Sequence, residues 1–260
     1  MSWQPLGPPI RQSFSKWRDG YNAVLIGSAQ VFICGGVGEK GDAYTARKCA
    51  LIVNQEGEVR VESMLRGRYS HTIRYVEVTA SVCVFGGFLH ESSSLSSAES
   101  FSLVQGRWKV LPDMLRIAGC SRACQHQSTI YLFDGELIEA FSVLLCSYFT
   151  PNIQLPVLDE SLFLIYEDVL CVISRGQLLK WDLNKSLLVQ QLPLTQQLGW
   201  RSGDLIRKDN WAYWRPVLRS GKSSYLCLDL NSAEVVHHAV SQKGVVTSSR
   251  PINFGSFRRN

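Results

Sequence analysis

The sequence predicts an all-β fold that is built from repeated small antiparallel sheets. A short strand-like apolar segment recurs every 34 to 51 residues, and two large apolar residues seven positions apart follow most of its copies. Helical spacing of apolar residues is nowhere sustained. Each period therefore holds three or four short strands, and five or six such periods along one chain are typical of a β-propeller.

The composition supports a folded protein with a substantial core. The 260 residues are 45% hydrophobic, 10% aromatic and 19% charged, which excludes disordered, collagen-like and coiled-coil chains. The longest apolar runs, such as residues 140–149, are shorter than the roughly 18 to 20 residues that span a bilayer, so we expect no membrane insertion. Residues 1–15 place prolines before any apolar run, unlike a signal peptide, and we expect a cytoplasmic protein.

The first repeated segment is a strand that ends in a glycine pair or its equivalent. Its plainest copies are residues 29–36 (AQVFICGG), 80–87 (ASVCVFGG) and 128–135 (STIYLFDG), and the same phase continues at 167–176, 209–216 and 243–249. Glycine at a strand end permits a tight bend or the close approach of two backbones. We prefer this role to phosphate binding, because no helix follows the glycines of GGVGEKG.

A predicted hairpin follows each of the first five strands, and its two apolar residues lie seven positions apart around turn-prone residues. The pairs are Ile52 with Val59, Phe101 with Trp108, Phe141 with Tyr148, Trp181 with Leu188, and Leu228 with Val235. A constant offset around a short turn brings both side chains to one face of the hairpin. Leu-Pro then closes the unit near residues 111, 155 and 192, since proline cannot donate to a continuing ladder.

Residues 68–114 resemble a kelch repeat. An arginine opens the first strand, a glycine pair ends the second, an aromatic residue lies in the third, and a Trp precedes a Leu-Pro-x-Met run. The resemblance is clear over residues 20–115 and degenerate beyond about residue 195. It implies one kelch-type β-propeller domain over residues 1–260, with Trp108 packed as core between blades.

We expect six blades of antiparallel sheet, with a ring that the N-terminal strand closes. Their approximate bounds are residues 10–63, 64–114, 115–156, 157–193, 194–240, and 241–260 together with 1–9. The last period is short, and Trp3 and Leu6 repeat the spacing of the closing strand that contains Trp108. These two residues should complete the blade that begins at Val245, because an open ring would expose strand edges. A five-bladed ring with loose ends is the alternative.

The eight cysteines are expected to be reduced, because the chain is large and lacks a leader. Those that lie inside strand-like runs, where a thiol behaves as a small buried hydrophobe, are Cys34, Cys83, Cys171 and Cys227. Cys120, Cys124 and His126 form a C-x3-C-x-H cluster without a second ligand pair nearby in sequence, whereas structural zinc takes four ligands. We therefore expect no metal site, and we expect Cys120 and Cys124 to be the least buried thiols.

No catalytic apparatus is visible in the sequence. It contains no HExxH, GxSxG, P-loop or paired CxxC motif, and the adjacent His237 and His238 should point to opposite faces of a strand. We expect a non-enzymatic protein without cofactor or small-molecule ligand. The alternatives are an enzyme that uses the propeller channel for a small substrate, and a weak nucleic-acid binder. The net charge of +5 carries no basic stripe, which disfavours the latter.

The kelch resemblance implies a protein-binding platform, used alone or as a structural subunit of a larger assembly. In that family, contact residues lie where the first strand opens and just after the glycine pair. The matching residues in this sequence are Arg68, Tyr69, Ser70, Phe88 and His90, with Glu39 after the glycine pair of the first repeat. We expect them to lie exposed together at one end of the blades, where Arg68 would bind an acidic or Ser/Thr-rich loop of a partner protein.

Overall fold

The structure is a computed structural model. It describes residues 20–27, 29–40, 43–54, 56–116, 119, 122–134, 137–153, 161–174, 176–194, 205–208, 211–214, 224–240 and 246–250. The chain divides into two compact units, Pro5–Val157 and Leu158–Asn260, and the second also includes Met1–Gln4. Regular structure within the described ranges is β-strand except for one 3-10 turn, η2 (Glu77–Thr79), so the predicted all-β class is confirmed.

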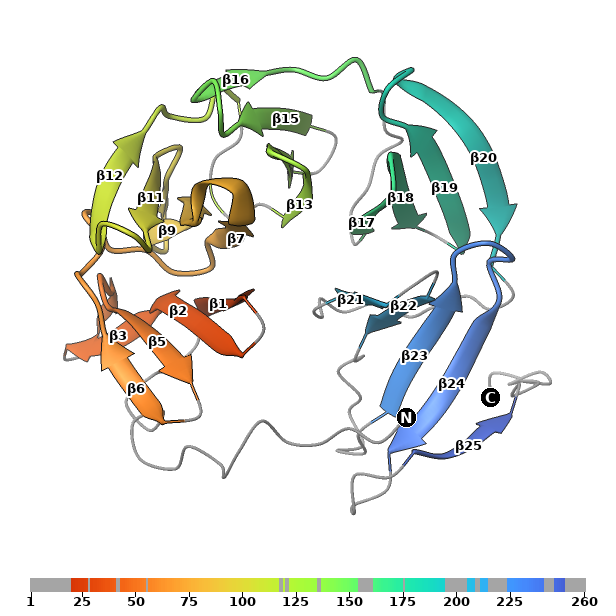
Figure 1. Cartoon of the computed structure of the whole chain (residues 1–260), viewed down its shortest axis with the longest axis horizontal. Coiled ribbons are helices and arrows are strands. Elements are labelled where there is room, and N and C mark those ends of the chain that lie inside the picture. The colour runs from red at the N-terminus through yellow and green to blue at the C-terminus, as the bar shows by residue number, and fades with distance from the viewer. Residues whose placement is uncertain are drawn as a thin grey trace. The chain divides into compact units, whose positions relative to one another are not determined.

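The first unit contains three four-stranded antiparallel sheets, coloured red to green in Figure 1. The first sheet consists of β1 (Tyr21–Ile26), β2 (Gln30–Gly35), β5 (Ala50–Asn54) and β6 (Gly57–Arg60). The second consists of β7 (Thr72–Val76), β8 (Ser81–Phe85), β11 (Ala98–Ser102) and β12 (Arg107–Leu111). The third consists of β13 (Arg122–His126), β14 (Thr129–Asp134), β15 (Leu137–Ser142) and β16 (Ser147–Phe149).

Two small hairpins form separate two-stranded sheets beside the first two sheets. They are β3 (Val37–Lys40) with β4 (Ala43–Ala46), and β9 (Phe88–His90) with β10 (Ser93–Ser94). Each hairpin is inserted between the second and third strands of its sheet, directly after a glycine pair. The chain therefore projects extra backbone at the same position in two successive repeats.

The second unit contains two sheets among the residues that are described. The fourth sheet consists of β17 (Leu162–Tyr166), β18 (Val169–Ser174), β19 (Gln177–Asp182) and β20 (Leu187–Pro193). The fifth consists of β21 (Leu205–Lys208), β22 (Trp211–Trp214), β23 (Ser224–Asp229), β24 (Val235–Val240) and β25 (Val246–Arg250). Successive antiparallel sheets of this kind fit a β-propeller.

The strand that was expected to begin a sixth sheet belongs instead to the fifth. β25 pairs antiparallel with β24, and His237 lies opposite Arg250. The prediction of a separate sheet for this strand is wrong, because the outer edge of β24 offers unpaired backbone groups to the next segment of the chain at the cost of closing only a short loop. Trp3 and Leu6, expected to close the ring, lie outside the described residues.

All five hairpin pairs that the seven-residue offset predicts are confirmed as directly opposed residues. They are Ile52 with Val59, Phe101 with Trp108, Phe141 with Tyr148, Trp181 with Leu188, and Leu228 with Val235. In each turn a side-chain oxygen accepts a backbone N–H two or three residues later, and the residues that provide it are Asn54, Ser102, Ser142, Asp182 and Asp229. The same local capping chemistry therefore supports the register of these five hairpins.

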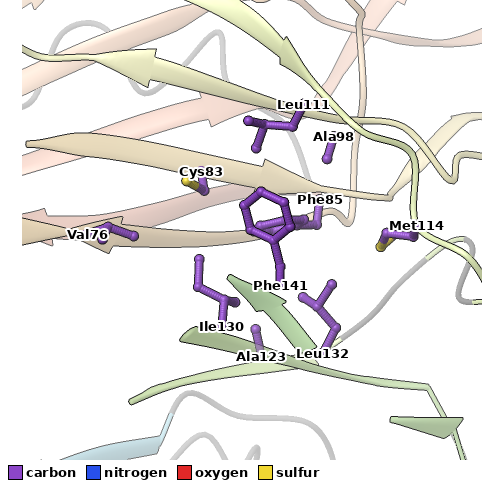
Figure 2. Packing of buried hydrophobic residues seen from close by; sticks show 10 residues of the cluster. All are labelled: Val76, Cys83, Phe85, Ala98, Leu111, Met114, Ala123, Ile130, Leu132 and Phe141. Carbon is purple, nitrogen blue, oxygen red and sulfur yellow. The ribbon is translucent and has the colours of Figure 1, made fainter. Parts of the chain in front are cut away.

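The sheets of the first unit pack face to face across two apolar cores. Between the first and second sheets, the ring of Phe32 lies 5.3 Å from that of Phe101 and 6.0 Å from that of Trp108, centroid to centroid. Between the second and third sheets, Phe85 meets Phe141 at 5.6 Å (Figure 2). Trp108 is 6% exposed, and its Nε1–H donates to the carbonyl of Glu62 at 2.7 Å, which confirms its predicted place between repeats.

The described cysteines are free thiols, and five of them are buried in strands. These are Cys34, Cys83, Cys124, Cys171 and Cys227, so the expectation that Cys124 would be accessible is wrong; it lies on β13, inside a sheet. Burial raises the pKa of Cys83 to about 12 and that of Cys227 to about 11. Cys146, in the β15–β16 turn, is the exposed thiol of the described set. No helix among the residues that the structure describes is long and apolar enough to cross a membrane.

The thiols provide a direct test of this arrangement. A thiol reagent added to the native protein should modify Cys146 first and leave the strand cysteines unmodified until the protein unfolds, because buried, protonated thiols do not react. A reductant should leave the melting temperature unchanged. Peptide mass mapping after brief labelling measures the order, with Cys146→Ser as the control; early labelling of Cys83 or Cys171 would contradict the structure.

Candidate interaction site

The segment that enters the second sheet, residues 61–71, is held by a carboxylate from that sheet. Glu99, on β11, is 2% exposed, and its Oε2 accepts the backbone N–H of Leu65 at 2.7 Å. Its Oε1 accepts the N–H of Arg66 at 3.4 Å. Because backbone donors from residues more than 30 positions away converge on one carboxylate, the path of this segment is fixed before it reaches β7.

Arg68 completes this site from inside the protein. Its Nη2 lies 2.7 Å from Oε1 of Glu99. Its Nη1 donates to the carbonyl of Gly86 at 2.6 Å and to that of Ser97 at 2.9 Å. Arg68 is only 1% exposed, so the expectation that it lies on an exposed rim is wrong. A buried carboxylate needs a compensating cation and several hydrogen bonds, and Arg68 is the side chain that satisfies Glu99.

The carboxylate part of this arrangement recurs in the third sheet. Glu139, on β15, is fully buried, and its carboxylate accepts the backbone N–H groups of Leu115 and Arg116. Glu99 and Glu139 lie two residues before Phe101 and Phe141, which are the first members of their hairpin pairs. The sequence analysis missed both residues. The signal was an ionisable residue at the same position of two otherwise buried strands, AESF and IEAF.

Tyr69 and Phe88 form the centre of the predicted site. Their backbones make a two-way bridge, with N–H···O distances of 3.1 and 2.9 Å, and their rings lie 5.7 Å apart at 30°. The predicted proximity of the strand opening to the residues after the glycine pair is therefore observed. Burial, then the charge of Glu91, raises the pKa of Tyr69, so its hydroxyl is a neutral donor at physiological pH.

Glycine makes this approach possible. Gly87 has φ +87°, and a Cβ at this position would lie 2.7 Å from the Tyr69 carbonyl oxygen and 2.8 Å from Cβ of His71. The glycine pair thus serves close backbone approach, as expected from the sequence. On its other side, Phe88 packs against Gly119, where an added Cβ would be 3.0 Å from Cζ of the ring.

The remaining predicted residues surround this aromatic pair. Ser70 is half-buried with φ 49°, and its N–H donates to the carbonyl of Gly20 at 2.7 Å. His90 is exposed, and its Nδ1 lies 3.3 Å from Oγ of Ser92. Glu39 lies on β3, opposite Tyr44 of β4, and β4 runs beside β9. The structure therefore brings together Tyr69, Ser70, Phe88 and His90, and it places the β3–β4 hairpin next to them.

Leu89 and Tyr21 add exposed surface at the same end of the strands. Leu89, between Phe88 and His90 on β9, is 39% exposed. Tyr21, at the start of β1, is 42% exposed, and Gly36 lies against its backbone. We call Tyr69, Phe88, Leu89 and His90 the aromatic site. It presents rigid rings and an aliphatic side chain, and it contains no free cation in place of the expected arginine.

His71 lies beneath the aromatic site and is uncharged. Burial, and then the positive charge of Arg68, lowers its pKa from 6.5 to about 3. Its Nε2 is 3.4 Å from Sγ of Cys34, and its buried Nδ1 has no hydrogen-bond partner. An imidazolium at this position would therefore lack an acceptor for one of its two protons.

The comparison with protein families bears on the residues that form this site. A family model described as the Kelch motif matches residues 84–115, which run from the end of β8 through β12. Residues 84–115 are therefore similar to a kelch repeat. The match includes Phe88, Leu89 and His90 of the aromatic site as well as Glu99 and Trp108, and it confirms the predicted kelch resemblance over residues 84–114. No curated protein matches the chain.

Among the residues that the structure describes, no three or more His, Cys, Asp or Glu side chains form a cluster that could bind a metal ion. Cys124 and His126 lie on β13, whereas Cys120, the third member of the C-x3-C-x-H cluster, lies outside the described residues. The chemistry that the aromatic site presents is contact by apolar and aromatic surface with a few hydrogen-bonding groups.

Replacing Arg68 by Ala should destabilise the protein strongly. The change leaves Glu99 buried without its cation, and removing one partner of a buried pair costs about 3–5 kcal/mol. Urea unfolding of wild type and variant measures the difference in the free energy of unfolding. The matched control is Arg66→Ala, an exposed neighbour, which should change this free energy by no more than about 0.5 kcal/mol. A loss below 1 kcal/mol for Arg68→Ala would mean that the pair does not hold the two sheets together.

The lowered pKa of buried His71 predicts that the protein loses stability in acid. Between pH 6.5 and pH 3 the unfolded chain binds a proton at this residue and the folded protein does not, so the free energy of unfolding should fall as the pH drops through this range. His71→Gln should make that pH dependence shallower, whatever it does to stability at pH 7. Urea unfolding measured at a series of pH values tests this, and equal slopes for variant and wild type would contradict the assignment.

Proposed function

We propose that this protein is a non-enzymatic β-propeller that binds a partner protein through the aromatic site. The observation that carries the proposal is the Tyr69–Phe88 pair, whose rings lie 5.7 Å apart beside exposed Leu89 and His90; Phe88, Leu89 and His90 belong to the matched kelch motif. Kelch domains generally mediate protein interactions. Rigid aromatic side chains are enriched among residues that dominate binding energy at protein interfaces, because they supply a large contact area at low entropic cost.

The partner segment that suits this site is apolar or aromatic. The guanidinium of Arg68 is neutralised by Glu99, and its Nη1 donates hydrogen bonds to the carbonyls of Gly86 and Ser97. It therefore does not recognise a partner carboxylate. This replaces the acidic or Ser/Thr-rich loop expected from the sequence. The Tyr69 hydroxyl and the His90 ring are the polar groups left to orient an extended segment laid across Phe88 and Leu89.

The arrangement of the sheets into a propeller belongs to the same proposal. Five successive sheets among the described residues, with β25 on the outer edge of the fifth, favour five blades over six. A single domain over residues 1–260, and a place as a subunit of a cytoplasmic assembly, are proposed from the kelch resemblance. Blades three to five vary most from the family pattern, which suits surfaces that partner subunits cover.

Removal of the aromatic site should weaken partner binding without unfolding the protein. Leu89→Ala with His90→Ala removes exposed side chains only, and Tyr69→Ala with Phe88→Ala removes the stacked pair. Partners are identified by affinity purification of the tagged wild type, and the purified partner is then titrated against each variant. We expect the Tyr69/Phe88 variant to lose about 2 kcal/mol of binding free energy, roughly 30-fold in Kd.

The control for this experiment is Val110→Ala, at a 70% exposed position of β12 away from the aromatic site. It should bind the partner as the wild type does. Thermal unfolding of the Tyr69/Phe88 variant separates lost contact from lost fold, because the aromatic pair itself contributes about 0.5–1.5 kcal/mol of stability. Full binding by a folded Tyr69/Phe88 variant would place the interface elsewhere.

A further inference from the structure

The backbone around the aromatic site leaves no place for an added strand. The N–H of Phe88 donates to the carbonyl of Tyr69 at 2.9 Å, and the carbonyl of Phe88 accepts the N–H of Tyr69 at 3.1 Å. The N–H of Gly87 donates to the carbonyl of Gly119 at 2.7 Å, and its own carbonyl accepts the N–H of Leu95 at 2.8 Å. A partner that adds a strand needs unpaired backbone groups at a sheet edge. A segment bound at the aromatic pair therefore has to be recognised by side chains.

The Tyr69 hydroxyl favours a segment whose carbonyl groups are free. Tyr69 is half-buried, and its hydroxyl stays protonated because burial, and then the charge of Glu91, raises its pKa. A helical segment uses all but its last four carbonyls internally, so it presents few acceptors to this donor. A polyproline II segment has no internal hydrogen bonds and leaves every carbonyl accessible. The donor therefore suits an extended partner segment that is neither a helix nor a paired strand.

The two aromatic rings are held rigidly and remain partly accessible. Tyr69 and Phe88 pack on each other with centroids 5.7 Å apart and planes at 30°, and both side chains are half-buried. Leu89, which is 39% exposed, continues the apolar surface. Sites lined by aromatic side chains are the ones that bind proline-rich segments, because such a segment already has the polyproline II conformation and loses little entropy on binding.

The charge beside the aromatic pair is negative. The β9–β10 hairpin, residues 88–94, has Glu91 as its one charged residue, and this residue is exposed in the turn. Arg68 does not offset this charge, because it is paired with a carboxylate inside the protein. Arg47, which follows the β3–β4 hairpin, is half-buried and has an interaction of its own. A basic side chain of the partner segment would therefore find a complementary charge in Glu91.

We propose that the aromatic site binds a proline-rich segment in the polyproline II conformation, with a lysine or arginine beside the prolines. This inference rests on the proposed function, because it names the kind of partner segment that the aromatic site recognises. The prolines pack on the rings of Tyr69 and Phe88, and the Tyr69 hydroxyl donates to a carbonyl of the segment. Glu91 pairs with the basic side chain and so sets the direction in which the segment lies.

Selection from random peptides tests the proposal with the full chain. The wild-type protein is used to select binders from a phage-displayed library of random peptides of about twelve residues, roughly four polyproline II turns. We expect the enriched sequences to repeat proline at the three-residue spacing of that helix and to carry Lys or Arg beside the prolines. The most enriched peptide is then synthesised, and fluorescence anisotropy measures its Kd for the wild type and for each variant.

Substitutions of single groups separate the contacts of the selected peptide. Tyr69→Phe keeps the ring and removes the donor, so the Kd should rise about fivefold. Glu91→Gln removes the charge, so the Kd should rise about threefold at low salt and depend less on salt than that of the wild type. The matched control is Glu77→Gln, at an exposed position beyond the other end of β7, and it should bind the peptide as the wild type does.

Three outcomes would overturn the proposal. The first is a selection that enriches no peptide, or enriches peptides without the proline spacing, such as amphipathic helices. The second is a proline-rich peptide that binds the folded Tyr69→Ala/Phe88→Ala variant as tightly as the wild type. The third is a Glu91→Gln variant that binds no differently from the Glu77→Gln control. None of these results contradicts the proposed function, which fails if the purified partner protein binds the folded Tyr69/Phe88 variant in full.

Discussion

The buried carboxylate of Glu99 is the interaction on which the arrangement of the second sheet depends. It accepts the backbone N–H groups of Leu65 and Arg66 and pairs with Arg68 at 2.7 Å. The segment of residues 61–71, which follows the first sheet, is therefore fixed to β11 of the second sheet. Removing a carboxylate from water is costly, and the cost is offset because a guanidinium and two backbone N–H groups converge on it. The path of the chain into β7 is therefore determined by one side chain.

The position of the aromatic site follows from this constraint. Arg68 extends from Glu99 to the carbonyls of Gly86 and Ser97, on either side of the inserted hairpin. The next residue, Tyr69, is then placed against Phe88, whose backbone it bridges. The Arg68 guanidinium is paired with Glu99 inside the protein, whereas the aromatic side chains lie at the surface. A site that seemed suited to anions is thus an apolar one, because the same ion pair that positions it also neutralises its charge.

The repeats differ in their surfaces while their turns share one chemistry. In the hairpin of the third and fourth strands of each of the five sheets, an oxygen of Asn, Ser or Asp caps the turn, and the apolar pair seven residues apart closes the strands behind it. Because the cap and the pair are sufficient for the register, the tip residues are free to vary. The second and third sheets use this freedom to carry aliphatic tips at one end, and the second sheet carries aromatic residues at the other. The two ends of the second sheet therefore present chemically different side chains.

The sequence by itself determined the strands, the hairpin pairs and the burial of Trp108, because these depend on apolar periodicity and on turn chemistry within about ten residues. It also located Tyr69 and Phe88 together, since an antiparallel meander returns the chain to the end of the same strand. Only the tertiary structure decided that Arg68 is buried, that Glu99 is its partner 31 residues away, and that β25 joins β24. An exposed and a buried arginine look the same in sequence, and the energy of a charge depends on which distant groups replace the water around it.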